Sequence, residues 1–180
     1  MSPLEQTIRQ DLHAYLLQSH KADEHLPETY DIEEKWDEIS RSYLPDGVRE
    51  FADYPIASLG WMMYIGMAVA RFWDLDWERH AHIDNLYTHL RDQRGYDQMD
   101  EYIIEKVLLL EPTDRQQIEH LIGECASRTY SQLRRQHIEP GTQEALQAYI
   151  DCLHQLYLFG AYIQLYQMNY HMTRIDGKDI

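Results

Sequence analysis

The sequence predicts an all-α fold, a single-domain bundle of about six or seven helices with two buried central helices. Apolar residues recur at the spacing of amphipathic helices, and no segment shows the alternation of a half-buried strand. Two segments, 54–70 and 156–163, are instead apolar on every side and contain glycine, which is typical of helices enclosed by other helices. Prolines separate the periodic segments, at Pro27, Pro45, Pro55, Pro112 and Pro140.

Length and composition fit one globular domain. With 180 residues and 44% hydrophobic residues, the chain can bury a core, so we expect one helical domain over residues 1–175 and a tail at 176–180. The net charge of −15 disfavours binding to nucleic acid or to an anionic membrane. The N-terminal residues contain no apolar secretory segment, and Cys125 and Cys152 fall on apolar or boundary positions. We therefore expect a cytoplasmic protein with both thiols reduced and buried.

The first two helices are marked by a capping motif and an apolar stripe. Ser2 precedes Pro3 and stands three residues before Glu5, so the Ser2 and Glu5 side chains can cap the free N–H groups of the first helix. The second helix is expected to end at the Pro45-Asp46-Gly47 sequence. Its apolar stripe consists of Ile32, Trp36, Ile39 and Tyr43.

The central helix is expected to begin at Pro55 and to run to about Trp73. Small and large side chains are scattered around its whole circumference, so no face is left for solvent. Glycine costs about 1 kcal/mol relative to alanine inside a helix, so Gly60 and Gly66 need a reason. We expect a second helix to approach closely there, with Gly60 or Gly66 near Gly160.

The remaining helices are placed by their capping residues. Asp74 or Asp76 is expected to cap the helix that follows the central one, and Asp97 to open the next. Thr113 is expected to be the N-cap of the helix after that. The last and longest helix is predicted over residues 143–174.

Ten histidines raise the question of a metal site. Glu78 with His82, and Asp151 with His154, are the pairs that can reach one ion from a single helix face. A carboxylate di-iron bundle needs a Glu-x-x-His motif on each of two helices, and the sequence contains none. Surface or boundary histidines are the simpler interpretation, with Asp151 as the expected partner of a core-facing His154. No cofactor is predicted, and a metal-binding bundle is the second alternative function.

Arg71 is the one charged residue inside the apolar central helix. It can extend to solvent near the end of that helix or pair with Asp74. Alternatively, a buried arginine binds an anionic ligand in a pocket that includes Trp61 and Tyr64. A small-ligand-binding or enzymatic bundle with this pocket is therefore the first alternative function.

Tyr162, Tyr166 and Tyr170 are spaced four apart and form a stripe on the last helix. A tyrosine stripe suits either the boundary of a core or a protein interface. The sequence contains no phosphate-binding glycine loop, no nucleophile elbow and no set of residues that would activate a Ser or Cys nucleophile. The leading hypothesis is therefore a non-enzymatic protein that acts through contact with a protein partner or with a second copy of itself.

Overall fold

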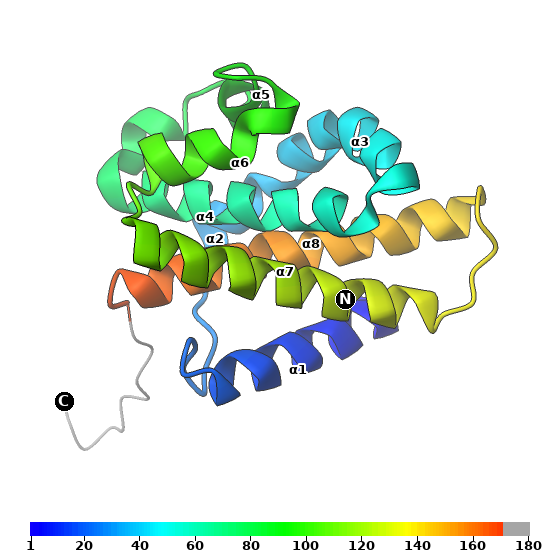
Figure 1. Cartoon of the computed structure of the whole chain (residues 1–180). Helices are drawn as coiled ribbons and strands as arrows, with labels where there is room; N and C mark the ends of the chain where they lie inside the picture. The colour runs from blue at the N-terminus through cyan, green and yellow to red at the C-terminus, as the bar shows by residue number, and fades with distance from the viewer. Residues whose placement is uncertain (171–180) are drawn as a thin grey trace.

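The computed structural model describes residues 1–170, and within them it contains α-helices and no strands (Figure 1). The predicted all-α, single-domain bundle is therefore confirmed. The long helices are α1 (Pro3–Gln18), α3 (Trp36–Asp53), α4 (Pro55–His80), α7 (Pro112–Arg134) and α8 (Gln143–Gln167). The short elements are α2 (Tyr30–Glu34), α5 (Leu86–Arg91), the 3₁₀ turn Tyr96–Gln98, α6 (Met99–Tyr102) and the π-helix Ile103–Val107.

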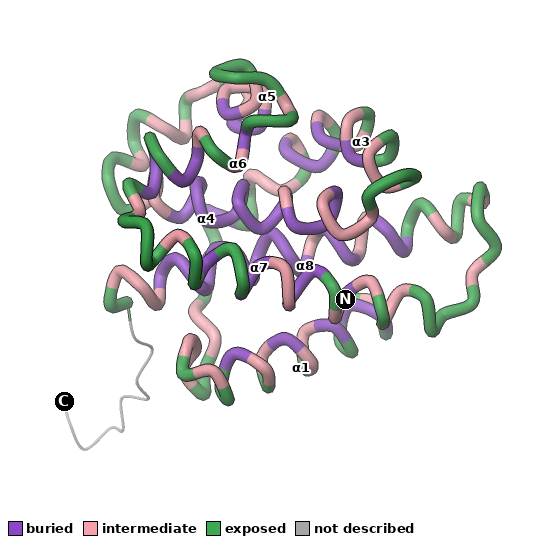
Figure 2. Tube along the Cα trace, in the orientation of Figure 1, coloured by how far each residue is buried: buried purple, intermediate pink, exposed green. Residues whose placement is uncertain are grey.

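Helices α4 and α8 form the centre of the bundle and are buried over most of their length (Figure 2). A Cβ atom at Gly66 would clash with the carbonyl oxygen of Tyr157, and one at Gly160 would clash with the carbonyl oxygen of Met63. Only glycine lets the two backbones approach this closely. The prediction of two central helices that meet at glycines is therefore confirmed, with Gly66 facing α8 and Gly60 facing α7.

The central helices run side by side in the same direction. The contacts between them follow the same order along both helices. Ser58 meets Tyr149, then Met63 meets Gly160, and then Arg71 meets Met168. Helices α1, α3 and α7 pack around this pair, while α5 and α6 lie along the outside of α4 (Figure 1). The carboxyl-terminal halves of α4 and α8 therefore meet at one end of the bundle.

The predicted helix break at Pro45 is wrong, because Pro45 lies inside α3. Proline removes one backbone hydrogen bond and disfavours a helix interior by about 3 kcal/mol. Packing on both sides of Pro45 holds the helix together. The Tyr43 hydroxyl donates to the carbonyl oxygen of Ser58, and the Ser58 hydroxyl donates to the carbonyl oxygen of Gly47 at 2.8 Å. Tertiary contacts thus outweigh the local preference.

Two of the predicted helix caps are confirmed and two are wrong. Asp97 does not cap a helix, because it lies inside the 3₁₀ turn Tyr96–Gln98 and Gln98 precedes α6. Ser2 and Glu5 form the capping box at the start of α1. Asp76 interrupts α4 with extended backbone angles and accepts a hydrogen bond from a backbone N–H in the following turn, as a capping aspartate does. Thr113 is not the N-cap of α7: Glu111 is, because Pro112 takes the first helical position.

Helix α8 ends at Gln167, and the rest of the helix predicted to residue 174, like the predicted tail at 176–180, lies largely outside the described residues. Cys125 and Cys152 are free and buried, as predicted. Helix α4 is long and apolar enough to cross a membrane by length and composition. However, 72% of its most apolar window is buried inside the bundle, as expected for a core helix.

Candidate functional site

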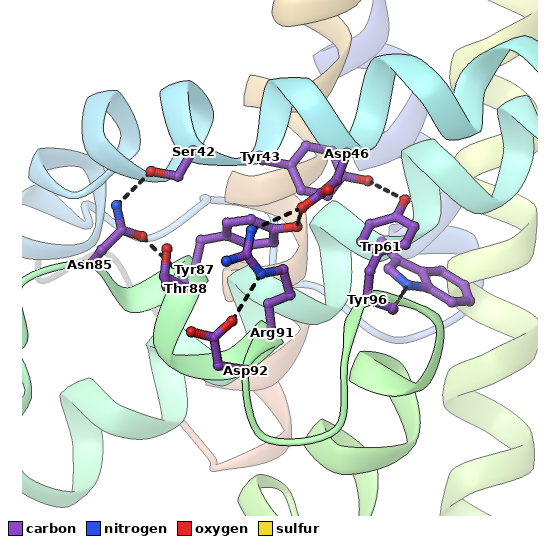
Figure 3. A network of polar contacts seen from close by, with 10 residues as sticks. All are labelled: Ser42, Tyr43, Asp46, Trp61, Asn85, Tyr87, Thr88, Arg91, Asp92 and Tyr96. Carbon is purple, nitrogen blue, oxygen red and sulfur yellow. Dashed lines mark hydrogen bonds and ion pairs between the residues drawn. The ribbon is translucent and has the colours of Figure 1, made fainter.

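One polar cluster joins α3, α4 and α5, and its buried polar groups are hydrogen-bonded to one another or to the backbone (Figure 3). We call it the Asp46 cluster; its members are Tyr43, Asp46, Trp61, Tyr87, Arg91 and Tyr96. The Asp46 carboxylate accepts hydrogen bonds from the Tyr87 hydroxyl and, at 3.3 Å, from Arg91 Nη1. Trp61 Nε1 donates to the carbonyl oxygen of Tyr96 at 2.9 Å. No buried side-chain nitrogen or oxygen of this cluster lacks a partner in the structure as described.

The tyrosines of the Asp46 cluster are held in their neutral form. Burial raises the pKa of Tyr87, and its hydrogen bond to the Asp46 carboxylate raises it further. Burial likewise raises the pKa of Tyr43 and Tyr96. Because every polar group is paired and the phenols do not ionise near neutral pH, the cluster fits a structural role that fastens α5 to the core.

The end of the bundle where α4 meets α8 contains a cavity of about 570 Å³, which we call the Arg71 cavity. Five chain segments gather there, on the left in Figure 1: the turn after α1, the second half of α4, the turn after the π-helix, the start of α7 and the end of α8. Its polar and charged lining comprises Lys21, Arg71, Asp114, Gln117, Gln164, Tyr166, Gln167 and Asn169. A volume of this size accommodates a small molecule.

Two buried polar atoms in the lining of the Arg71 cavity have no hydrogen-bond partner among residues 1–170, namely Arg71 Nε and Gln164 Oε1. The other contacts of the Arg71 guanidinium are weak: Nη1 lies 3.4 Å from Asp74 Oδ2 and 3.9 Å from the sulfur of Met168. The predicted pairing of Arg71 with Asp74 is confirmed. The Gln164 side chain is only 5% exposed. Buried polar atoms without a partner are rare in proteins and need an explanation.

Backbone geometry around the Arg71 cavity is set by helix ends. Leu109 and Asn169 line the cavity with φ of 54° and 66°, and His20, next to Lys21, has φ of 55°. His20 and Asn169 each follow an α-helix that is closed by a Schellman hydrogen bond, from Lys21 N–H to Leu16 C=O and from Tyr170 N–H to Leu165 C=O, both at 2.9 Å. Leu109 follows the π-helix, which is closed by a wider bond from Leu110 N–H to Ile104 C=O at 3.1 Å. These caps use the last carbonyl groups of the helices, so the side chains dominate the polarity of the cavity.

The ligand-binding residues proposed from the sequence separate into two places. Arg71 lines the cavity and contacts Asp74, which also accepts a hydrogen bond from the Tyr170 hydroxyl at 2.5 Å. Trp61 and Tyr64 do not line the Arg71 cavity. Their rings contact each other at a centroid distance of 6.0 Å, and Trp61 belongs to the Asp46 cluster.

The three predicted interface tyrosines do not share one environment. Tyr162 is only 5% exposed, Tyr166 is half-buried and lines the Arg71 cavity, and Tyr170 is 42% exposed. The side chains therefore pass from core to surface along α8, as at the boundary of a core. Association with a second copy or with another protein stays a prediction.

The four residues considered for a metal site lie in different surroundings. Glu78 and His82 are exposed, Asp151 accepts a hydrogen bond from Gln147 at 2.9 Å, and His154 pairs with Glu5. Glu5 rather than the expected Asp151 is thus the partner of His154, with 2.7 Å between Nδ1 and Oε1. Across residues 1–170, no group of three or more His, Cys, Asp or Glu side chains gathers in a way that could hold a metal ion.

Sequence reasoning did not identify Lys21 or Gln164 as site residues. Lys21 stands in a polar loop, and nothing local marks it. Gln164 could have been noticed in the sequence, because it is a polar residue directly after the apolar segment 156–163. Comparisons with protein-family models, with curated protein sequences and with solved structures find no match for this chain. The function must therefore be argued from the geometry.

Proposed function

We propose that this protein binds a small carboxylate-bearing molecule in the Arg71 cavity. The observation that carries the proposal is the pair of buried, unpartnered atoms, Arg71 Nε and Gln164 Oε1, which belong to the lining of one cavity. A carboxylate accepts two parallel N–H bonds from a guanidinium, and these charge-assisted bonds are about twice as strong as neutral ones. The ligand would satisfy Arg71, and a hydroxyl or amine group on the same molecule would donate to Gln164.

The charges of the lining support a ligand of mixed polarity. Lys21 and Arg71 contribute two positive charges and Asp114 one negative charge, in a chain whose net charge is −15. The helix ends add partial charges of about half a unit each, negative at the ends of α1 and α8 and positive at the start of α7. The full positive charges favour a carboxylate, while Asp114 and Gln164 favour a donor group elsewhere on the ligand.

Binding without turnover is the form of the proposal that the lining supports. Within residues 1–170, the lining of the Arg71 cavity includes no histidine, cysteine or serine. These side chains supply most nucleophiles and general bases in enzymes. Gln117, Gln164 and Gln167 instead provide neutral amide groups, which orient a ligand without reacting with it.

Thermal unfolding in the presence of lactate, glutamate or succinate tests the proposal. A bound carboxylate at about ten times its Kd stabilises the fold by about 1.4 kcal/mol, which raises the Tm of a chain of this size by about 3–5 °C. Arg71→Gln should abolish that rise. Arg49→Gln is the matched control, because Arg49 is exposed on α3 and does not line the cavity. Equal ligand-induced shifts in the two variants, or no shift with any of the three compounds, would contradict the proposal.

A further inference from the structure

A second cavity, of about 420 Å³, lies between α1, α8 and residues 27–33. Glu5 lines it and orients the polar groups of two other lining residues. Glu5 is only 6% exposed. Its Oε2 accepts a hydrogen bond from the backbone N–H of Ser2 at 3.0 Å. Its Oε1 contacts His154 Nδ1 at 2.7 Å and accepts from Gln155 Nε2 at 3.1 Å. We call this space the Glu5 cavity.

Glu5 is charged despite its burial. Burial raises the pKa of its carboxyl group, but the hydrogen bonds from Ser2, Gln155 and His154 outweigh that effect, and the pKa lies below its usual value. A carboxylate carries no proton, so the bond to His154 requires Nδ1 to be the donor.

A hydrogen bond to Glu5 also orients the side-chain amide of Gln155. Gln155 is fully buried and lines the Glu5 cavity, and its Nε2 is used by the bond to Glu5. Among residues 1–170, its Oε1 has no hydrogen-bond partner. Glu5 therefore leaves Gln155 with a free acceptor, and a ligand that satisfies it must supply a hydrogen-bond donor.

The charges of the lining select the kind of donor. Glu5, Glu28 and Glu33 contribute three carboxylates, which outnumber the positive groups, Arg9 and the α-amino group of Met1. Arg9 is held at the wall, since its Nη1 donates to the Tyr162 hydroxyl at 3.3 Å and its guanidinium lies over the Tyr162 ring. The lining thus combines a negative net charge with the unpartnered acceptor of Gln155, whereas positive charges prevail in the Arg71 cavity.

We propose that the Glu5 cavity is a second binding site, which takes a small aliphatic ammonium compound. An ammonium group has three N–H donors and no acceptor, and so matches the unpartnered acceptor of Gln155. The glutamates at the mouth attract it, and apolar groups of Pro27 and Leu158 can contact its methylene chain. The two cavities share no lining residue, so this site stands independently of the carboxylate site.

Calorimetric titration at low salt with putrescine, and with butanediol as its neutral analogue, tests the proposal. Putrescine should bind and butanediol should not, and added salt should weaken binding because the mouth glutamates are exposed. Glu28→Gln together with Glu33→Gln should weaken putrescine binding about tenfold or more. Glu34→Gln is the matched control: this neighbour is exposed on the same helix but does not line the cavity, so its change should stay within about twofold.

Gln155→Met separates binding inside the cavity from general attraction to an acidic surface. It leaves every surface charge in place and removes the unpartnered acceptor, so putrescine binding should fall about tenfold or more. Arg71→Gln should leave putrescine binding unchanged, which distinguishes failure of this proposal from failure of the carboxylate proposal. Equal binding of butanediol and putrescine, absence of putrescine binding, or unchanged affinity in Gln155→Met would overturn the proposal.

Discussion

The Asp46 cluster and the Arg71 cavity each contain an arginine beside an aspartate, but they differ in how completely their polar groups are paired. Arg91 binds two carboxylates, and the phenol that shares Asp46 with it is satisfied as well (Figure 3). Arg71 holds one aspartate at 3.4 Å and leaves Nε buried without a partner. A completed polar network rigidifies a fold, whereas an incomplete one beside a cavity is poised for a ligand. We therefore assign a structural role to the polar groups of the Asp46 cluster and a ligand-binding role to those of the Arg71 cavity.

The largest effect on stability is expected where the network is complete. Asp46→Ala leaves the buried Tyr87 hydroxyl without its acceptor, which should lower the free energy of unfolding by about 2–3 kcal/mol and the Tm by about 5–10 °C. Asp92→Ala is the matched control, because Asp92 contacts the same arginine from a side chain that is 59% exposed. It should cost less than about 0.5 kcal/mol. Equal losses in thermal unfolding of the two variants would show that the cluster is not a structural unit.

Glu5→Gln should have the next largest effect and should change with pH. The folded pKa of Glu5 lies below its usual value, so its contribution to stability is present above that usual value and disappears as the pH falls through the folded pKa. We expect a loss of about 1–3 kcal/mol near neutral pH and a smaller acid-induced loss than in the wild type. Urea unfolding between about pH 7 and about pH 3 measures both. Parallel pH curves for variant and wild type would contradict this role of Glu5.

Gln164→Leu should leave stability nearly unchanged or raise it by up to about 1 kcal/mol, because it removes a buried acceptor that has no donor. The same change should remove the carboxylate-induced rise in Tm. This outcome is the opposite of that for Asp46→Ala, and it sharpens the contrast between the two regions. A loss of more than about 1 kcal/mol in urea unfolding, with carboxylate binding intact, would place Gln164 among the structural residues.

The smallest effect is expected at the two thiols. Burial raises the pKa of Cys125 and of Cys152 to about 12, so almost no thiolate is present near neutral pH. Neither residue lines the Arg71 or Glu5 cavity. Thiol reagents should therefore react with the folded protein only as fast as it opens, and a bound carboxylate should not block that reaction directly. Rapid labelling of either cysteine, followed by mass spectrometry, would show that the core around α7 and α8 is open.

The fold could be predicted because its signals are local or compositional. The helical spacing of apolar residues predicts the all-α class. The glycines of the two apolar segments predict that these helices pack together at the centre, because Gly66 and Gly160 allow the two backbones to come into contact. Pro45 misled because packing of its neighbours on α4 and α8 outweighs a local preference. Thr113 misled because two residues could serve as cap, and Pro112 selects the earlier one.

The candidate sites could be predicted only where a residue breaks its own pattern. Arg71 stood out as one charge within an apolar helix, and it lines a cavity, but Trp61 and Tyr64, which were expected to share its pocket, do not. The link between Glu5 and His154 could not be inferred, because 149 residues separate them and Glu5 already had a local role in the capping box. The carboxylate serves both purposes through its two oxygens, and only the packing of α1 on α8 reveals the second.

We infer that Arg71 Nε and Gln164 Oε1 have no partner among residues 1–170 because a ligand supplies one to each. A crystal structure of the protein with the carboxylate that raises the Tm most tests it directly. We expect a carboxylate oxygen about 3 Å from Arg71 Nε and a donor of the same molecule about 3 Å from Gln164 Oε1. A cavity closed by the protein's own side chains, with both atoms bonded within the chain, would contradict the claim.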